Sequence, residues 1–179
     1  LFLFGGDPGV GKSTLLLKIA SQIEQKVLYL SAEESLEQVK DRVLRIGGKL
    51  DNLLFLAESN LDAIINATNR EAPVLVVVDS IQTVYDPAFP STAGSLVQVR
   101  ECTLRLQTIA KQKNISFLLV SHVTKDGNIA GPRMLEQIVD GVLYLDHEND
   151  DMRLIRSVKK RIGPTTEVAV LQMRSQGIT

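Results

Sequence analysis

The chain has 179 residues, of which 44% are hydrophobic and 23% are charged, and this ordinary globular composition fits one domain over residues 1–179. The net charge of −1 excludes a protein that binds polyanions over its whole surface, so any contact with nucleic acid must come from a local cluster of Lys and Arg. The single cysteine, Cys102, excludes an internal disulfide, and no apolar run is long enough to span a membrane, so we expect a protein of the reducing cytoplasm without a membrane partner.

Strand and helix patterns alternate from the first residue onward. Apolar residues at helical spacing predict a helix from residue 12 to about 25. Ser35, followed by Gln38 three residues later, resembles a capping box and predicts the start of a second helix. Short apolar runs between the helices predict buried strands. The expected order is a strand over 1–4, the helix from 12, a strand over 27–30, a helix to about 46, a strand over 53–57 and a helix over 61–68.

The second half of the chain continues this alternation. Residues 74–79 form a continuous aliphatic run that ends in Asp79, the pattern of a strand buried on both faces of a parallel sheet. The later elements are a polar stretch over 82–94, a helix from 95 to about 111, a strand over 116–123, a loop over 124–133, a helix over 135–139, a strand over 142–145 and a hairpin over 152–158 and 167–173. We therefore predict an α/β fold, with a mostly parallel twisted sheet, helices on both faces and a C-terminal β-hairpin at one edge.

A glycine-rich loop between the first strand and the first helix carries the clearest chemical signal. Its sequence matches G-x-x-x-x-G-K-[ST], the phosphate-binding loop of P-loop NTPases. Glycines allow the backbone N–H groups to surround a triphosphate, and the helix that follows aims its positive end at the same place. Lys12 would contact the outer phosphates, and the Ser13 hydroxyl would ligate Mg²⁺. We therefore expect ATP and Mg²⁺ as ligands, with nucleotide contacts from Gly6, Asp7, Pro8, Gly9, Val10, Gly11, Lys12, Ser13 and Thr14.

Carboxylates at two strand ends would complete the reaction centre, because parallel sheets bind ligands at the carboxyl ends of their strands. Asp79 ends the most hydrophobic strand, as a Walker B aspartate does, and would hold Mg²⁺ through water beside Ser13. Hydrolysis also needs a residue that activates water. We expect Glu33 in that role, and Glu34 is the alternative, since it could instead be a solvated charge at the start of a helix.

Two further sites have both a functional and a structural interpretation. His122 ends the strand over 116–123 and could sense the γ-phosphate, although histidines in such positions are often structural hydrogen-bond donors. Lys159, Lys160 and Arg161 form a basic turn, which is usually a solvated charge cluster. A cation on such a hairpin could also enter the active site of a neighbouring subunit and stabilise the transferred phosphoryl group, so we name Lys159 and Arg161 as catalytic candidates.

The order of these motifs resembles the RecA superfamily, and more closely the RadA (Sms) family of bacterial DNA-repair proteins. The resemblance covers nearly the whole chain, and the loop after His122 is more specific to that family than the phosphate loop. The family's K-N-R-F-G motif corresponds here to Lys159-Lys160-Arg161-Ile162-Gly163, in which Lys replaces Asn and Ile replaces Phe. The matching stretches are residues 5–16, 30–35, 78–83, 98–102, 121–127 and 130–133.

The resemblance implies a RecA-like, ATP-hydrolysing motor that acts on single-stranded DNA in recombinational repair and branch migration. It also implies a homo-oligomeric, hexameric ring and a recombinase of the RecA type as a partner. DNA would contact the loops over 86–94 and 125–133, where Lys125 and Arg133 are the cations. The family's N-terminal zinc module and C-terminal Lon-like domain are not in this sequence, so we expect it to be the ATPase core of a longer protein.

Two other functions fit parts of the sequence. One is a RecA-fold signalling ATPase or autokinase that resembles KaiC, against which the loop after His122 argues. The other is a nucleotide-dependent scaffold that does not hydrolyse ATP, against which Glu33 and Asp79 argue.

Overall fold

The fold is built on one continuous sheet, in the order β3-β2-β4-β5-β1-β6-β7-β8-β9. The computed structural model describes residues 1–122, 131–161, 167–174 and 177–178. The strands from β3 to β6 pair in parallel, whereas β7, β8 and β9 pair antiparallel. The strands are β1 (Phe2–Gly6), β2 (Val27–Ser31), β3 (Leu53–Leu56), β4 (Leu75–Asp79), β5 (Ser116–Val120), β6 (Gly141–Asn149), β7 (Met152–Lys160), β8 (Val168–Arg174) and β9 (Gly177–Ile178).

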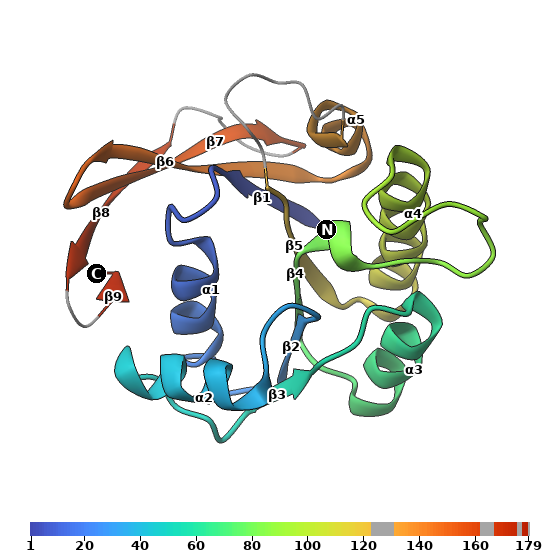
Figure 1. Cartoon of the computed structure of the whole chain (residues 1–179), viewed down its shortest axis with the longest axis horizontal. Coiled ribbons are helices and arrows are strands. Elements are labelled where there is room, and N and C mark those ends of the chain that lie inside the picture. The colour runs from blue at the N-terminus through green and yellow to red at the C-terminus, as the bar shows by residue number, and fades with distance from the viewer. Residues whose placement is uncertain (123–130, 162–166, 175–176, 179) are drawn as a thin grey trace.

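Helices cover both faces of the sheet (Figure 1), α1 and α2 on one side and α3, α4 and α5 on the other. Each long helix begins at a recognisable cap. Ser35 and Gln38 form the predicted capping box of α2, and Asn60 and Ser95 cap α3 and α4. The helices are α1 (Lys12–Ala20), α2 (Leu36–Arg45), α3 (Leu61–Glu71), the short 3₁₀ helix η1 (Ile81–Thr83), α4 (Leu96–Lys113) and α5 (Gly131–Ile138).

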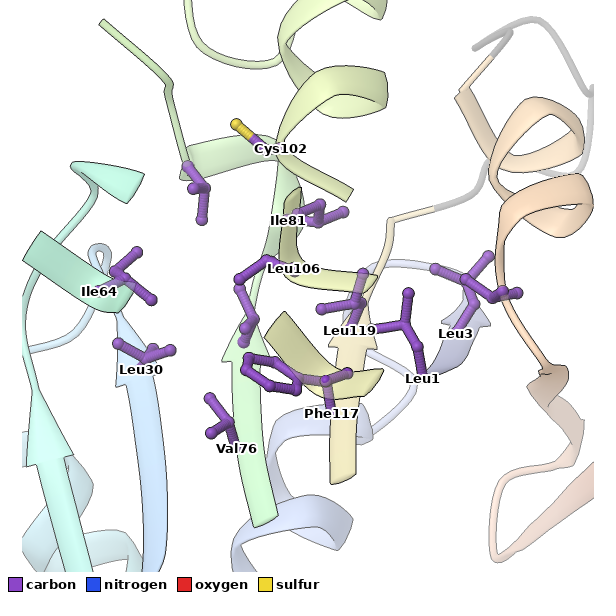
Figure 2. Close-up of a cluster of buried hydrophobic side chains, with 14 of the residues drawn as sticks. Leu1, Leu3, Leu30, Ile64, Val76, Ile81, Cys102, Leu106, Phe117 and Leu119 are labelled. Atoms are coloured by element: carbon purple, nitrogen blue, oxygen red, sulfur yellow. The ribbon is translucent and has the colours of Figure 1, made fainter. Parts of the chain in front are cut away.

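Two hydrophobic cores, one on each face, explain why the central strands are apolar at every position. Along β4, Val76 and Val78 enter the core under α3, α4 and α5, whereas Val77 enters the core under α1 and α2. Figure 2 shows the first of these cores, where Cys102 of α4 lies among aliphatic side chains above β4 and β5. Burial raises the pKa of the Cys102 thiol to about 12, so this cysteine is a core residue.

The predicted fold class is confirmed, and the differences are local. α1 ends at Ala20, before the predicted residue 25, and in its last turn Ser21 Oγ donates a hydrogen bond to Lys18 O at 2.9 Å. The predicted strand over 142–145 is only the inner part of β6, which continues to Asn149 and forms a second hairpin with β7. The predicted hairpin of β7 and β8 is present. Within the described residues, no helix combines the length and the apolar character that crossing a membrane requires.

Candidate nucleotide-binding site

The predicted site residues lie at the carboxyl ends of neighbouring parallel strands, β2, β4, β5 and β1. The phosphate loop follows β1, the two glutamates follow β2, Asp79 ends β4, and His122 follows β5 by two residues. Ser31 lies opposite Asp79 in the pairing of β2 with β4, and Ser121 N donates to Phe4 O at 2.9 Å. The strand order therefore brings these segments to the same end of the sheet.

The phosphate loop is shaped by two glycines whose backbone conformations other residues rarely adopt. Gly6 has a φ of 147°, and a Cβ there would lie 2.4 Å from the carbonyl oxygen of Leu145. Gly11 precedes α1 with a φ of 107°, in the left-handed region. The loop therefore turns tightly from β1 into α1 and leaves its backbone open to a ligand. This is the cradle that a triphosphate needs.

Lys12 is buried inside this loop, with 4% of its surface exposed. Its Nζ donates to Gly6 O at 2.8 Å and to Asp7 O at 2.9 Å, so the ammonium group lies against the loop backbone. Burial lowers the pKa of Lys12, although the nearby carboxylates of Asp79 and Asp7 oppose that change. A phosphate in the loop would add the negative charge that favours the protonated lysine.

Asp79 is nearly buried, with 8% of its surface exposed, and a tyrosine of the neighbouring strand holds it. The Tyr29 hydroxyl donates to Asp79 Oδ2 at 2.6 Å. Burial, and then the charge of Asp79, raise the pKa of Tyr29 well above its ordinary value, so the hydroxyl keeps its proton. Sequence reasoning missed this tyrosine, because in an apolar strand it looks like an ordinary core residue.

A cavity of about 280 Å³ lies over the phosphate loop and has a charged wall. Glu34 belongs to this wall and pairs with Arg42 of α2, while Glu34 Oε2 is buried and has no hydrogen-bond partner among the described residues. Glu33 is exposed and is not part of the lining. The lining consists of Gly9, Gly11, Lys12, Ser13, Thr14, Glu34, Arg42, Arg45 and His122.

Arg42 and Arg45 were also missed by sequence reasoning. They lie one turn apart on α2, where arginines near a helix C-terminus are commonplace and carry no signal of ligand binding. Their spacing of three residues on the helix that follows the glutamates was the available clue, since it puts both side chains on one face. Two cations beside the phosphate loop favour an anionic ligand in this cavity.

His122 joins the cavity from the end of β5. It is half-buried, and its Nδ1 atom is buried without a hydrogen-bond partner in the described part of the chain. The residue before it, Ser121, accepts a hydrogen bond from Gln82 Nε2 at 2.8 Å, which ties the end of β5 to the segment after β4. His122 therefore belongs to the cavity wall, while its buried Nδ1 atom is left without a partner among the described residues.

These residues fit a magnesium nucleotide. The loop offers backbone donors and Lys12 to phosphates, and Ser13 and Asp79 offer the oxygen atoms that Mg²⁺ prefers. The described residues contain no group of three or more His, Cys, Asp or Glu side chains that could hold a metal by themselves.

Comparison with known proteins decides the family. The family described as "AAA domain" matches residues 1–128. The chain belongs to this AAA domain family. DNA repair protein RadA of Listeria monocytogenes is 50% identical over 99% of this chain, and RadA of Bacillus subtilis is 49% identical over 100% of this chain. In both cases the chain spans 40% of the relative. The resemblance to RadA that the motifs predict is confirmed.

A solved structure confirms the RecA-like fold of this AAA domain. A KaiC-like protein from the archaeon Pyrococcus horikoshii superposes with a TM-score of 0.76, over 99% of this chain and 87% of that protein. The two sequences are 20% identical, so the similarity concerns the fold and does not extend to function.

The predicted finger residues of the AAA domain lie away from its own phosphate loop. Lys159 pairs with Val142 near the start of β6, whereas the loop begins where β6 has reached Leu145. Lys159 Nζ donates to Glu136 O, and Arg161 pairs with Asp140 at 3.1 Å. The fold therefore does not bring these two cations into the cavity of the same chain.

The structure describes more of the first predicted DNA loop, over 86–94, than of the second, over 125–133. Lys125 lies outside the described residues, and of Arg133 the structure describes the backbone, within α5. The segment over 86–91 is held by one buried side chain, that of Gln98. Its Oε1 accepts from Asp86 N at 2.7 Å, and its Nε2 donates to the carbonyl oxygens of Asp86, Phe89 and Ser91, each at 3.0 Å.

Proposed function

We propose that this chain is the ATP-hydrolysing core of a DNA-repair motor that acts on single-stranded DNA. The observation that carries the proposal is the cavity over the phosphate loop, where Lys12, Ser13, two arginines and His122 meet beside a nearly buried Asp79. Relatives named DNA repair protein RadA, similar over nearly the whole chain, give the cellular process. Recombination, branch migration and a RecA-type recombinase as partner belong to the same proposal.

Each side chain has a defined task in hydrolysis. The loop backbone and Lys12 bind the phosphates of ATP, and Ser13 and the water-mediated Asp79 hold Mg²⁺. A bound Mg²⁺ would neutralise charge on the phosphates during transfer. Glu33 accepts a proton from the water that attacks the γ-phosphorus, while the bond to the bridging oxygen breaks and ADP leaves. His122 donates to the γ-phosphate and responds to its loss.

The choice of Glu33 as the base rests on the different surroundings of the two glutamates. Glu34 Oε1 is paired with Arg42 and Glu34 Oε2 is buried, so this carboxylate is held in one orientation. For Glu33 the described part of the structure shows no hydrogen bond or ion pair, and its exposed carboxylate can turn toward a bound water. Apo active sites are often looser than the complex, so a base that lies outside the cavity lining before ATP binds is compatible with the role.

The position of Lys159 and Arg161 supports a ring in which each subunit completes its neighbour's site. Arg161 is 49% exposed and lies far along β6 from the phosphate loop of its own chain. From this position a cation can stabilise transferred phosphate in a neighbouring subunit. A hexamer with head-to-tail interfaces would place each turn beside the next phosphate loop.

The test is ATP hydrolysis by the full-length protein with and without single-stranded DNA. We expect faster turnover with DNA, and no binding of a fluorescent ATP analogue by Lys12→Ala. The matched control is Lys18→Ala, which removes the other lysine of α1 and should bind normally. Tight ATP binding by Lys12→Ala would exclude the proposed role of the loop. An ATP hydrolysis rate that is the same with and without single-stranded DNA would exclude a DNA-dependent motor.

A further inference from the structure

Tyr29 connects the hydrophobic core under α1 and α2 to Asp79. It lies on β2 opposite Val77 of β4, two residues before the register pair of Ser31 and Asp79. Two residues of strand rise by about 6.6 Å, and the long tyrosine side chain covers that distance. Its hydroxyl thereby reaches Asp79 Oδ2 at 2.6 Å, from the neighbouring strand.

The tyrosine ring is held firmly in place. Tyr29 has none of its surface exposed and is part of the core under α1 and α2, together with Leu16, Val43 and Val77. Because buried rings in a close-packed core keep one rotamer, the position of the hydroxyl is fixed before any ligand arrives. A hydroxyl that donates to a carboxylate at this distance is also a strong, charge-assisted hydrogen bond.

We propose that Tyr29 is a positioning residue for magnesium, because its hydroxyl fixes the orientation in which Asp79 receives the metal-bound water. The hydrogen bond occupies Oδ2 and leaves Oδ1 as the acceptor for that water. Groups that orient a metal-holding carboxylate in this way change metal affinity or activity by about 10–100-fold when they are removed. The inference rests on the proposed function, since it assigns Tyr29 to the same ATP site.

The test compares Tyr29→Phe with the unmodified full-length protein, because phenylalanine keeps the ring in the core and removes the hydroxyl. ATP hydrolysis is measured against Mg²⁺ concentration, and ATP binding is measured separately in excess chelator. We expect the Mg²⁺ concentration for half-maximal hydrolysis to rise about tenfold or more. Metal-independent ATP binding, which depends on Lys12 and the loop, should stay the same.

Tyr144→Phe is the matched control. The Tyr144 hydroxyl donates to Glu136 Oε1 at 3.2 Å, on the other face of the sheet, so its loss should leave the Mg²⁺ dependence unchanged. A second comparison introduces Tyr29→Phe into an Asp79→Asn protein. If Tyr29 acts through Asp79, the double variant should need no more Mg²⁺ than Asp79→Asn by itself.

The outcomes separate the two proposals. A normal Mg²⁺ requirement in a well-folded Tyr29→Phe protein, or an equal loss of metal-independent ATP binding, would overturn the positioning role while hydrolysis by the unmodified protein still stands. An unmodified protein that neither binds nor hydrolyses ATP would overturn the proposed function itself, and the role of Tyr29 with it.

Discussion

Two consecutive glutamates at the end of β2 lie in different surroundings. Glu34 lines the cavity and pairs with Arg42, whereas Glu33 is exposed and lies outside the lining. A residue that lines a site is not thereby its base, because proton transfer needs a carboxylate that can turn to the attacking water. Glu34 instead pairs with Arg42 of α2 in the wall of the cavity over the phosphate loop.

This difference predicts opposite kinetic effects for two equally conservative substitutions. Glu33→Gln should bind ATP normally and lose about 100-fold or more in kcat, because general bases contribute that much. Glu34→Gln, its matched control, should keep most of its kcat and raise the KM for ATP, since Arg42 loses its partner. Steady-state kinetics measure both. The reverse pattern would assign the base to Glu34.

At the scale of elements, the segment after η1 is ordered by α4. Gln98 is buried in the first turn of this helix and makes four hydrogen bonds to the backbone over 86–91. Asp86, also buried, pairs with Arg105 on the same helix. This part of the predicted DNA loop is therefore held by α4, and a DNA contact there would meet a preformed surface.

Gln98→Leu should loosen this segment. Leucine keeps the volume of the side chain but leaves buried backbone groups unpaired, which costs about 1–3 kcal/mol for each unsatisfied group that water does not reach. We expect a loss of about 2–4 kcal/mol in unfolding free energy and faster hydrogen exchange at residues 86–91. Denaturant unfolding and exchange measure the two. Gln137→Leu, at an exposed position on α5, should change neither.

Acid should weaken the same attachment. Burial raises the pKa of Asp86, but hydrogen bonds from Arg105 and from the N–H of Ala88 outweigh it, so this pKa lies below its ordinary range. Because the folded pKa is the lower one, Asp86 stabilises the fold above the unfolded value of about 3.9, and its contribution is lost as pH falls through the folded pKa. Asp86→Asn should therefore be less stable at pH 7 and show a shallower loss below pH 4, by denaturant unfolding. An exposed control, Asp51→Asn, should follow the unmodified protein.

The strands and helices differ in how well the sequence pattern predicts them. Apolar runs and caps specify the parallel strands and their helices, because burial on both faces leaves a continuous pattern, as in β4. The outer half of β6 carries the polar sequence Asp146-His147-Glu148-Asn149 and gives no such pattern, so its pairing with β7 was missed. These residues extend beyond β1, whose pairing with β6 ends at Leu145, and they are partly or fully exposed, so pairing with β7 and not burial stabilises this part of the strand.

Part of the candidate site could also be predicted from the sequence, namely the residues that belong to motifs. The phosphate loop and Asp79 have fixed spacing and position, because their chemistry depends on backbone shape at strand ends. Arg42, Arg45 and Tyr29 depend on packing between α2, β2 and β4, which no local pattern records. Such residues become visible when the strand order is known.

At the scale of the whole molecule, β7 connects two places that the proposed mechanism needs. Near its start, the buried Arg153 donates through Nε to Val10 O in the phosphate loop, at 3.1 Å. At its other end, Lys159 on β7 and Arg161 directly after it belong to the basic turn. One strand thus supports the phosphate loop of its own chain and presents the cations that we assign to a neighbour. Arg153 was also missed by sequence reasoning, since the alternating pattern of β7 does not indicate which charge is buried.

This arrangement predicts complementation between two inactive proteins. Glu33→Gln lacks the base but keeps Arg161, whereas Arg161→Ala keeps the base but lacks the finger. In a mixed ring, an interface that takes its phosphate loop from the Arg161→Ala chain and its finger from the Glu33→Gln chain is complete. Random assembly of equal amounts makes about one interface in four complete, so hydrolysis should recover to about a quarter of the unmodified rate.

The control mixture combines Glu33→Gln with Lys12→Ala. Both substitutions damage the same cavity, so every interface takes its phosphate loop from a defective chain and no recovery is expected, whatever the order of subunits. ATP hydrolysis after joint unfolding and reassembly of full-length proteins measures both mixtures. If Arg161 instead acted within its own chain, every site of the first mixture would lack either the base or the finger, and this mixture would stay as inactive as the second. Such action would also require the basic turn, which lies beside the start of β6, to reach the phosphate loop opposite Leu145 of the same subunit.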